Sequence, residues 1–463
     1  MTAVTEPPQQ SFRIEMLWTD ARYRSGFLQV IALMLVMLAV AWVVDNTIRN
    51  LEALGKDFDF SFLFAPASYD INQVLIDYTS RSPHWRAALV GMLNTLILAF
   101  VGCITCTIIG VIAGVLRLSK NWVVSRLMLV YIEAARNVPL LLQILLWGAI
   151  FSETMPAPRD YRGEEPAATL WFDAIAATNR GFYIPRPLFE AGSGVVVGVF
   201  VASLIGLFIW NRWRKAHQNA TGQTLTPRLE QIGKGFAVPA GLAVAWLFFP
   251  GFDQGTLAIA IKAVVALGLG AGSAWLLYTF NTLSVRLAIL SVPAVLAFFV
   301  MGSPITLAYP ELRGFNFLDG EGQAIYLRNS FMALWLALSL YTGAFVAEIV
   351  RGGILAVSKG QSEAAAALGL RPNLIMSLVI LPQALRIIIP PQISQFLNLT
   401  KNTSLAIAIG YMDVTGTLGG ITMNQTGREM ECMLLLMAFY LVISLTISAV
   451  INAYNERVKL KER

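Results

Sequence analysis

Polar side chains interrupt an apolar stretch that runs from residue 382 to residue 411. The interruption reads QFLNLTKNTS, from Gln395 to Ser404. On a helix with 3.6 residues per turn, Gln395, Asn398 and Asn402 lie on one face, because seven residues make nearly two turns. Polar groups at membrane depth are costly and usually face a cavity or a partner helix. We therefore expect this face to form hydrogen bonds with a polar ligand or with a neighbouring subunit.

Arg136 is the second residue suited to binding a ligand. It lies just before Val138-Pro139, where a helix break is expected. A guanidinium group holds a carboxylate through two parallel hydrogen bonds, and every free amino acid carries an α-carboxylate. The alternative interpretation is a structural pair with Glu133, three residues away on the same helix.

Two further patterns are explained by local pairing or packing. Glu348 and Arg351 stand three residues apart, and we interpret them as an ion pair on one helix. Cys103 and Cys106 form a C-x-x-C inside an apolar helix, without the Cys or His partners that zinc and redox sites need. We therefore predict no metal site.

The sequence contains no phosphate-binding loop of the form G-x-x-x-x-G-K-[ST]. The only Gly-Lys pairs are Gly55-Lys56 and Gly233-Lys234, which Asp57 and Gly235 follow. Any energy for transport must therefore come from another chain or from an ion gradient. The formal net charge of +6 is modest, and it fits basic loops of a membrane protein better than a nucleic-acid-binding surface.

The composition predicts an all-α, polytopic membrane protein. The 463 residues are 56% hydrophobic and only 13% charged, with a mean hydropathy of +0.63, whereas soluble domains are about 25% charged. Apolar runs of spanning length predict about ten transmembrane helices. They are expected near residues 27–45, 87–116, 122–151, 191–211, 236–250, 256–280, 287–302, 326–350, 382–411 and 431–453.

Basic residues predict the orientation, because loops on the cytoplasmic side carry an excess of Lys and Arg. The loop 211–235 has five basic residues against Glu230 alone, so we place it inside. The loop 152–190 has four basic and six acidic residues, so we place it outside. Both termini are then expected in the cytoplasm, as an even number of spans requires.

A small, alanine-rich segment lies in a predicted cytoplasmic loop, 352–381. It begins EAAAALGL at Glu363. Gly360 is expected to end the preceding helix, and Ser362 is expected to cap a short helix that starts at Glu363. Gly369 is expected to stop that helix, and Pro372 to open a second short one. We expect two short helices joined by a tight bend, with an alanine face that lets another backbone come close.

These residues resemble the coupling loop of the membrane subunits of ABC importers. That loop reads E-A-A, three residues, G, nine residues, I-x-L-P. The matching positions here are Glu363, Ala364, Ala365, Gly369, Leu381 and Pro382, with Val379 in place of the isoleucine. The flanking blocks VAEIVRGGILAVSKGQ and LPQALRIIIPPQISQFLNLTKNTSLA, together with YIEAARNVPLLLQ at 131–143, resemble the polar amino-acid uptake class. Asn137 stands where that class usually has a glycine.

The resemblance covers residues 85–151 and 325–455, which together imply the five-helix core of this permease fold. The stretch 152–324 between them is predicted to be an insertion that carries extra spans. Such an insertion resembles the larger permease subunits of proteobacterial general L-amino-acid importers. The remaining parts are an N-terminal segment, 1–84, with the first transmembrane helix and an outside loop, and a cytoplasmic tail, 456–463.

The resemblance also implies roles for single residues and for partners. The six loop residues would dock on a separate ATPase subunit, which binds ATP and Mg²⁺, so no cofactor is expected in this chain. The substrate-binding residues would be Arg136, Gln395, Asn398, Asn402 and Thr403, while Lys401 would lie at a subunit interface or near lipid headgroups. The chain would translocate L-amino acids across the bacterial inner membrane with a second permease, ATPase subunits and a periplasmic binding protein.

Two other classes of membrane protein were weighed. An ion-coupled secondary amino-acid transporter would need an internal repeat with interrupted helices in matching halves, and the sequence shows no second E-A-A-like block. A membrane scaffold or sensor would not need polar groups in mid-membrane. The importer permease is therefore the favoured interpretation.

Overall fold

The computed structural model describes most of the chain between residues 18 and 458. The gaps are 19–20, 54, 56–57, 164–165, 224–229, 235–267, 269–270, 280–288, 290, 292, 296, 299–300, 303, 313–316 and 318–323. The chain divides into two compact units. Unit 1 comprises Met1–Gly148 and Ala333–Arg463, and unit 2 comprises Ala149–Met332.

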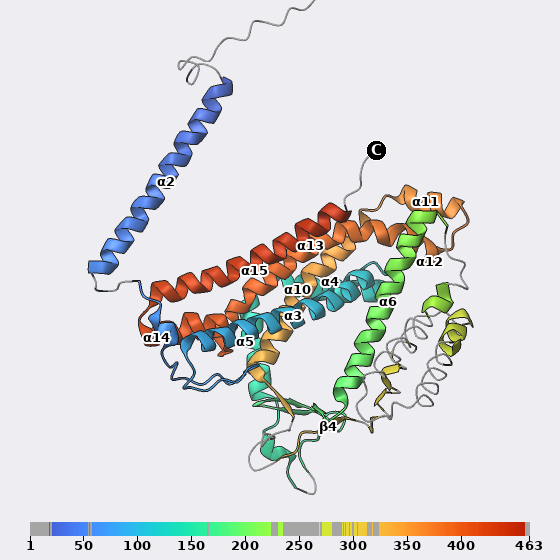
Figure 1. Ribbon diagram of the computed structural model, residues 1–463, viewed down its shortest axis with the longest axis horizontal. Helices are drawn as coiled ribbons and strands as arrows, with labels where there is room; N and C mark the ends of the chain where they lie inside the picture. Colours follow the sequence, from blue (N-terminus) through green and yellow to red (C-terminus); the bar gives the residue numbers. More distant parts are fainter. Residues whose placement is uncertain are drawn as a thin grey trace, which may run out of the picture. The chain divides into compact units, whose positions relative to one another are not determined.

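Unit 1 is mainly helical in its described residues, with an irregular segment at 65–83 (Figure 1). Its helices in chain order are α2 (Ala21–Ala53), the 3₁₀ helix η1 (Ser61–Phe64), α3 (His84–Arg117), α4 (Trp122–Asn137), α5 (Leu140–Glu153), α10 (Asn329–Leu355), α11 (Lys359–Ala367), α12 (Pro372–Leu374), the π-helical η3 (Ile375–Ile380), α13 (Leu381–Asn402), the 3₁₀ helix η4 (Thr403–Ile409), the π-helical η5 (Thr415–Thr422), α14 (Met423–Thr426) and α15 (Glu429–Val458). Helices α5 and α10 continue into unit 2.

The described helices account for seven of the predicted spans. Six are long and apolar enough to cross a membrane, and a seventh is added if the bent pair α4 and α5 is one span. The predicted span 122–151 is this pair, whose two helices meet at 105°. The predicted span 236–250 lies outside the described residues, and 256–280 and 287–302 are described only in part.

Helix α3 is the central packing element of unit 1, and small residues let its neighbours come close. A methyl group added at Gly110 would lie 2.5 Å from Cβ of Val346 on α10. One added at Gly114 would lie 2.6 Å from the carbonyl oxygen of Ala347. These distances are too short for a real contact, so α3 and α10 touch backbone to backbone, as small residues allow between membrane helices.

The C-terminal part of unit 1 packs on the same helix. Figure 1 shows α13 and α15 running side by side, and both α13 and η5 contact α3. Leu399 of α13 fits over Gly102, with 3.2 Å between its Cδ2 and a methyl group added there. Val414, just before η5, and Leu418 within η5 are fully buried, in a cluster with Ala88 of α3. Helix α3 therefore joins the two sequence segments of unit 1.

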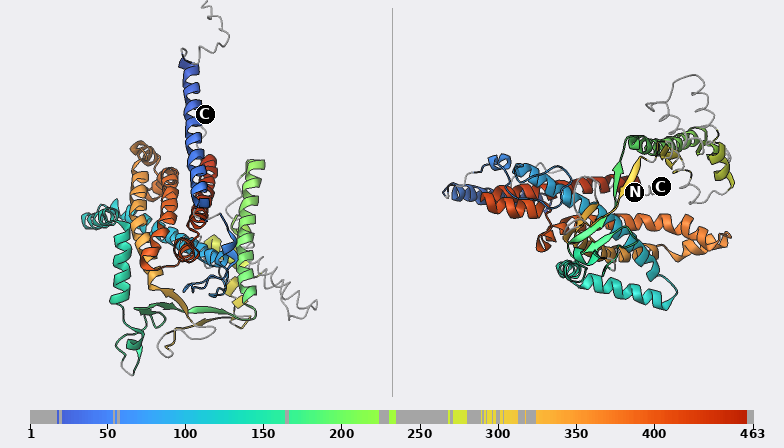
Figure 2. Two further views of the ribbon diagram at one scale, coloured as in Figure 1. Left: turned by 90° about the vertical axis from the view of Figure 1, so that its left-hand side faces the viewer. Right: turned by 90° about the horizontal axis from the view of Figure 1, so that it is seen from below.

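The 352–381 loop bends at Gly369, as predicted. Gly369 has a φ of +74° and follows directly on α11 and Leu368, its C-cap. The Leu370 N–H donates to Ala365 O at 3.3 Å, and the Gly369 N–H donates to Ala366 O at 2.9 Å. This pair of bonds is a Schellman motif, which ends a helix with a left-handed residue and satisfies its last carbonyl groups. Figures 1 and 2 show α11 and α12 together at one end of α13.

The predicted start of this helix was wrong. Helix α11 begins at Lys359 with Ser358 as N-cap, so Gly360 lies inside it rather than ending α10, which stops at Leu355. The Ser358 side chain makes no capping hydrogen bond, and the Gln361 N–H instead donates to the Ser358 carbonyl at 3.1 Å. Because residues on both sides of Ser362 favour helix, a cap residue alone does not decide where the helix begins.

The second helix of the loop was also predicted too short. Pro372 does open it, but α12 continues through η3 into α13, and 372–409 count as one candidate span. Pro382 has no N–H to donate, which fits the wider π-helical turn just before it. Pro390 and Pro391 lie inside α13, which continues as a single helix through both residues.

Unit 2 contains short strands as well as helix, which the sequence did not predict. Strands β1 (Ala176–Thr178), β2 (Gly181–Ile184) and β5 (Ile325–Arg328) form an antiparallel sheet in the order β1-β2-β5. Strands β3 (Arg186–Phe189) and β4 (Ile305–Ala308) form a second antiparallel pair. The 3₁₀ helix η2 (Pro158–Tyr161) precedes the strands, and α6 (Ser193–Thr221) follows β3.

Aromatic rings fill the core of the three-stranded sheet. Tyr183 is fully buried and stacks on Tyr326 of the neighbouring strand, with 4.9 Å between the ring centroids. Phe317 packs against Tyr183 at 5.4 Å and meets Tyr161 edge to face at 5.2 Å. The Tyr161 hydroxyl donates to Ala177 O at 2.6 Å. Tyr161 is therefore held both by this hydrogen bond and by the contact of its ring with Phe317. Paired aromatics of this kind stabilise a small sheet that has little other core.

Asp413 caps the helical segment that begins at Val414. It is fully buried, and its Oδ1 accepts a hydrogen bond from the Gly416 N–H at 2.8 Å. Asp413→Ala should lower the free energy of unfolding by about 0.5–2 kcal/mol, because it leaves a buried N–H without an acceptor. Asp413→Asn should keep most of the stability, since Asn is an equally good cap. Thermal unfolding of the purified transporter would measure both, and equal losses in the two variants would contradict the capping role.

Candidate functional site

The predicted polar face of α13 is present and has no partner within the described chain. Gln395 and Asn402 are half-buried, and Asn398 is exposed. The structure records no hydrogen bond from these three side chains to any described residue. Amide groups that remain unpaired at the surface of a membrane helix need a ligand, water or a neighbouring subunit. The face is therefore available for binding.

Thr403 differs from the other predicted substrate residues. It is fully buried, its hydroxyl donates to Thr400 O at 2.8 Å, and it lies 3.5 Å from the Tyr440 hydroxyl. In this conformation it joins α13 to α15. Lys401 is exposed. Gln392, which sequence analysis did not single out, donates from Nε2 to Thr107 Oγ1 at 3.0 Å and ties α13 to α3.

Arg136 lies in the last turn of α4, beside the bend between α4 and α5. Its guanidinium carbon sits 5.2 Å from the ring centroid of Phe345 on α10, and the side chain is otherwise exposed. The structure records no ion pair between Arg136 and Glu133, whose Oε2 instead accepts from Asn137 Nδ2 at 3.2 Å. The guanidinium edge, where N–H groups donate, thus stays available to a carboxylate.

A buried glutamine that the sequence did not reveal supports this bend. Val138 has extended backbone angles, and Pro139 cannot donate a hydrogen bond, so α4 ends with free carbonyl groups. Gln143 Nε2 donates to Ala135 O at 2.8 Å and to Val138 O at 2.9 Å. Gln143 therefore closes the break and fixes the place where Arg136 emerges. In the sequence, this role was indicated only by the position of Gln143, a polar residue four positions after Pro139.

Glu348 joins α3 to α10 near the 352–381 loop. The predicted ion pair with Arg351 is confirmed, with 2.9 Å between Glu348 Oε2 and Arg351 Nη2. Arg117, the last residue of α3, adds a second cation at 3.6 Å from Glu348 Oε1. All three side chains are at least two-thirds buried. The carboxylate thus sits between two guanidinium groups from different helices.

A hollow of about 370 Å³ lies next to the end of the α13 span. Ile407, Tyr411, Ile421, Asn424 and Gln425 line it, with three glycines between them. Its volume falls in the range of small-molecule sites, which are mostly apolar with a few polar groups. Its first lining residue, Ile407, follows Asn402 by five positions, and none of the three amide residues of the α13 face lines it.

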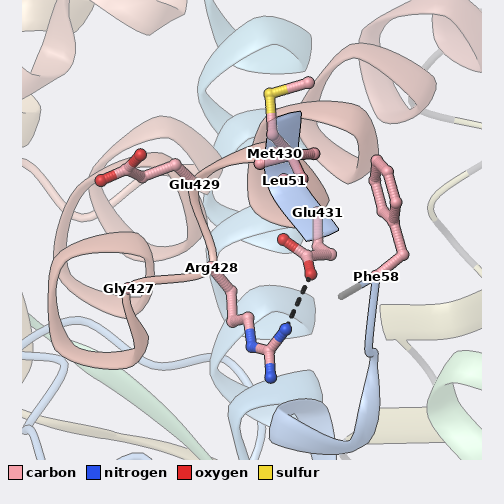
Figure 3. Close-up of a pocket in the computed structure, with 7 residues that line it drawn as sticks. All are labelled: Leu51, Phe58, Gly427, Arg428, Glu429, Met430 and Glu431. Atoms are coloured by element: carbon pink, nitrogen blue, oxygen red, sulfur yellow. Dashed lines mark hydrogen bonds and ion pairs between the residues drawn. The ribbon is translucent and has the colours of Figure 1, made fainter. Parts of the chain in front are cut away.

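A second cavity, of about 20 Å³, has room for a water molecule and not for an amino acid (Figure 3). Arg428 and Glu431 line it and lie 3.3 Å apart. Arg428 also lies 3.7 Å from Asp59. Hydrogen bonds from the Ser61 hydroxyl and N–H hold the pKa of Asp59 below its usual value, so its carboxylate stays charged at neutral pH. These charges join the 58–83 segment to the start of α15.

The predicted coupling residues lie in an exposed part of unit 1. Glu363 and Ala364 are exposed on α11, whereas Ala365 is buried. Helix α11 packs on η3, where Ile375 is buried. Leu368, between α11 and the bend, is 82% exposed. Leu381 and Pro382 are exposed at the start of α13. The segment thus presents small, apolar and acidic groups that no described residue covers.

Comparison with known proteins assigns the family. Residues 264–460 match the model of the binding-protein-dependent transport system inner membrane component. The glutamate/glutamine/aspartate/asparagine transport system permease protein BztB of Rhodobacter capsulatus is 47% identical over 474 residues, which cover 100% of both chains. The chain belongs to the permease family of amino-acid ABC transporters. The general L-amino acid permease AapQ of Rhizobium johnstonii is 38% identical over 98% of this chain and 96% of its own. The putative amino-acid permease YhdX of Escherichia coli is 36% identical over 95% of both.

Membership of this permease family confirms the predicted class and excludes the secondary-transporter alternative. The chain is an ABC importer permease, a multi-pass protein of the inner membrane, and a non-catalytic subunit of its transport system. Within the described residues, no three His, Cys, Asp or Glu side chains come together in a group that could hold a metal ion. The three cysteines are free thiols, and Cys106 and Cys432 are buried.

Removing Glu348 should weaken the contact between α3 and α10. Glu348→Ala leaves Arg117 and Arg351 without their shared carboxylate, and hydrogen bonds to charged groups contribute about 1.5–3 kcal/mol. Glu133→Ala is a matched control on an exposed carboxylate and should change stability by less than about 0.5 kcal/mol. Thermal unfolding of the purified transporter compares the two. A Glu348→Ala variant as stable as Glu133→Ala would show that the pairing contributes nothing.

Proposed function

We propose that this permease imports polar L-amino acids as one of two homologous membrane subunits above a pair of ATPase subunits. The observation that carries this proposal is the exposed 352–381 loop. A nine-residue helix ends there in a rigid glycine bend and leaves Glu363, Ala364 and Leu368 uncovered. Such a surface suits close docking to another protein, because small residues permit close approach and one carboxylate offers an anchor for a cation.

The names of the relatives support the substrate class. BztB is named for glutamate, glutamine, aspartate and asparagine, and AapQ for L-amino acids in general. The polar face of α13 fits such breadth, because uncharged amides both donate and accept hydrogen bonds. Neither Gln395 nor Asn402 imposes a charge on the substrate side chain. We therefore assign a broad preference for polar amino acids to this chain.

Arg136 is proposed to hold the α-carboxylate that all these substrates share. Gln395, Asn398 and Asn402 are proposed to face the variable side chain, and Thr403 would join them only if its contact with Tyr440 opens. The structure records no direct contact between Arg136 and Gln395. Both α4 and α13 pack on α3, however, so a movement around α3 could bring the two ends of a site together.

The proposed permease core is formed by residues 85–151 and 325–455. Packing of α3 against α10, α13 and η5 supports this division, because it joins the two segments within unit 1. The stretch 152–324 would be an insertion, with residues 1–84 as an N-terminal segment and 456–463 as a tail. The family match extends to 264–460 and therefore also includes part of the proposed insertion.

ATP and Mg²⁺ are proposed to bind to the partner ATPase, since the sequence of this chain has no phosphate loop. Both termini and the 352–381 loop would lie in the cytoplasm, and a periplasmic binding protein would deliver the substrate from outside. Closure of the ATPases would push the loop and shift the permease pair from inward-open to outward-open. The ligands drive this change because each has a different affinity for the two states.

The docking role of the loop is tested by Gly369→Leu. Leucine is strained at a φ of +74°, and it adds a bulky group where a partner backbone comes close. Co-purification with the ATPase and uptake by reconstituted vesicles should both fall at least about tenfold, because strain of about 1–2 kcal/mol adds to the steric conflict.

Gly369→Asn is the matched control. Asn tolerates left-handed angles, and a Cβ at this position meets no atom within 4 Å in this chain, so the bend should survive. Because the bend is kept in Gly369→Asn, any partial loss of co-purification or uptake in this variant would be due to the size of the Asn side chain alone. Normal co-purification and uptake in Gly369→Leu would show that the loop is not the docking surface.

The substrate assignments predict two different phenotypes. Arg136→Ala should impair uptake of every amino acid. The loss in transition-state stabilisation should be about 2–4 kcal/mol, provided that bound substrate covers the exposed guanidinium and excludes water from the pair. Gln395→Glu should favour cationic over acidic substrates, because two charges about 6 Å apart interact by about 3 kcal/mol at an effective dielectric near 20. Uptake of arginine, glutamine and glutamate with saturating binding protein measures both. An unchanged ranking, or loss of one substrate only, would refute the assignments.

A further inference from the structure

Among its described residues, unit 2 carries one large aromatic side chain that is almost wholly exposed. Phe172 is 92% exposed, and Trp171 before it is 47% exposed. Phe172 and Asp173 have φ values of +53° and +54°, so two consecutive residues that are not glycine take left-handed angles. Such angles favour Gly, Asn or Asp, and a phenylalanine there is a marked outlier. Strained backbone of this kind often occurs at binding sites.

The turn that carries Phe172 is held firmly. Trp171 and Ile175 exchange two backbone hydrogen bonds, of 2.8 Å and 3.0 Å, which close the loop of three residues between them. The Trp171 ring packs on Phe182 of β2, with 6.0 Å between centroids. Phe182 in turn meets Phe151 at 5.4 Å, and both are buried. The exposed ring therefore projects from a rigid support, which reduces the entropy lost on binding a partner.

Chain order places β5 before the start of α10 and the 352–381 loop after its end. Strand β5 ends at Arg328 and pairs with β2, α10 begins at Asn329, and the loop follows its end at Leu355. Asn329 Nδ2 donates to Phe151 O at 3.2 Å and to Asn179 O at 2.6 Å, so the small sheet and the start of α10 are tied together. If α10 crosses the bilayer and the loop meets the ATPase inside, the sheet and its turn lie outside.

We propose that the Phe172 turn is a docking point on the permease for the substrate-binding protein. The inference rests on the proposed function and extends it to unit 2. Single exposed aromatics on rigid supports are typical anchors of protein interfaces. The Asp173 carboxylate lies next to Phe172 in the chain. We therefore expect the binding protein to have an apolar pocket for the Phe172 ring, with basic residues at its edge.

A membrane surface is a less suitable partner for this turn. The 152–190 stretch has six acidic against four basic residues, and anionic headgroups would repel it. Aromatic residues that anchor proteins at membrane interfaces usually have Lys or Arg beside them, whereas the neighbours of Phe172 are Trp171 and Asp173. The binding protein, which arrives from the outside solution, fits the charge of this surface better.

The first test measures how much binding protein stimulates ATP hydrolysis by the complete transporter in nanodiscs. Phe172→Asn should keep the turn, because Asn tolerates left-handed angles, and remove the ring. The concentration of loaded binding protein that gives half-maximal stimulation should rise about tenfold, while the same maximal rate is approached at saturation. Phe172→Tyr is the matched control and should stay within about twofold of the native chain, because it keeps the ring. An unchanged half-maximal concentration in Phe172→Asn would overturn the inference.

The second test uses a photo-crosslinking benzoylphenylalanine placed at position 172 or at position 368. Crosslinks from 172 to the binding protein support the inference, and crosslinks to lipid or to the second permease alone overturn it. Position 368 reports on the proposed function independently, because the exposed Leu368 should crosslink to the ATPase. Failure at 368, or a native transporter that binding protein does not stimulate, counts against the proposed function. Success there with failure at 172 counts against the docking point alone.

Discussion

Backbone hydrogen bonding without water is the constraint on which this structure depends. In hydrocarbon each unpaired N–H or C=O group costs several kcal/mol, so a membrane helix can be interrupted only where something else satisfies the freed groups. The structure meets this demand differently at each interruption. Gln143 closes the break after α4, and Asp413 opens the segment after η4. The irregular backbone is thereby fixed in place, and the candidate binding groups lie beside it.

The same interruptions separate rigid parts from parts that can change. Helices α3 and α10 touch through glycine and alanine, and Glu348 links their ends to Arg117 and Arg351. They form a stiff pair because small residues bring their backbones into direct contact, and close-packed interfaces resist rearrangement. The polar face of α13, in contrast, has unpaired amides, and Arg136 has only a ring contact. Groups without fixed partners can change partners as the transporter changes state at little energetic cost.

Local chemistry decided which features could be predicted from sequence. The bend at Gly369, the break at Val138-Pro139 and the Glu348–Arg351 pair follow from residues within a few positions of each other, and the structure contains all three. Arg117 and Gln143 act through partners that only packing brings close, so their roles stayed hidden. The strands of unit 2 were missed because each is only three or four residues long and depends on aromatic pairing across the sheet. The substrate-contact and docking roles were proposed from the family resemblance, because they depend on partners outside this chain.

The length of α10 has a mechanical consequence. Its 27 residues form a rod, about 40 Å long at 1.5 Å per residue. A rod of that length that pivots by about 10° at one end moves its other end by about 7 Å, more than one helical turn. If α10 pivots close to Leu355, a small sideways movement at that end becomes a larger one at Asn329 and at the strand before it. The helix can therefore transmit a displacement from one end to the other. Its stiffness, which depends on the glycine contacts with α3, determines how much of that displacement is transmitted.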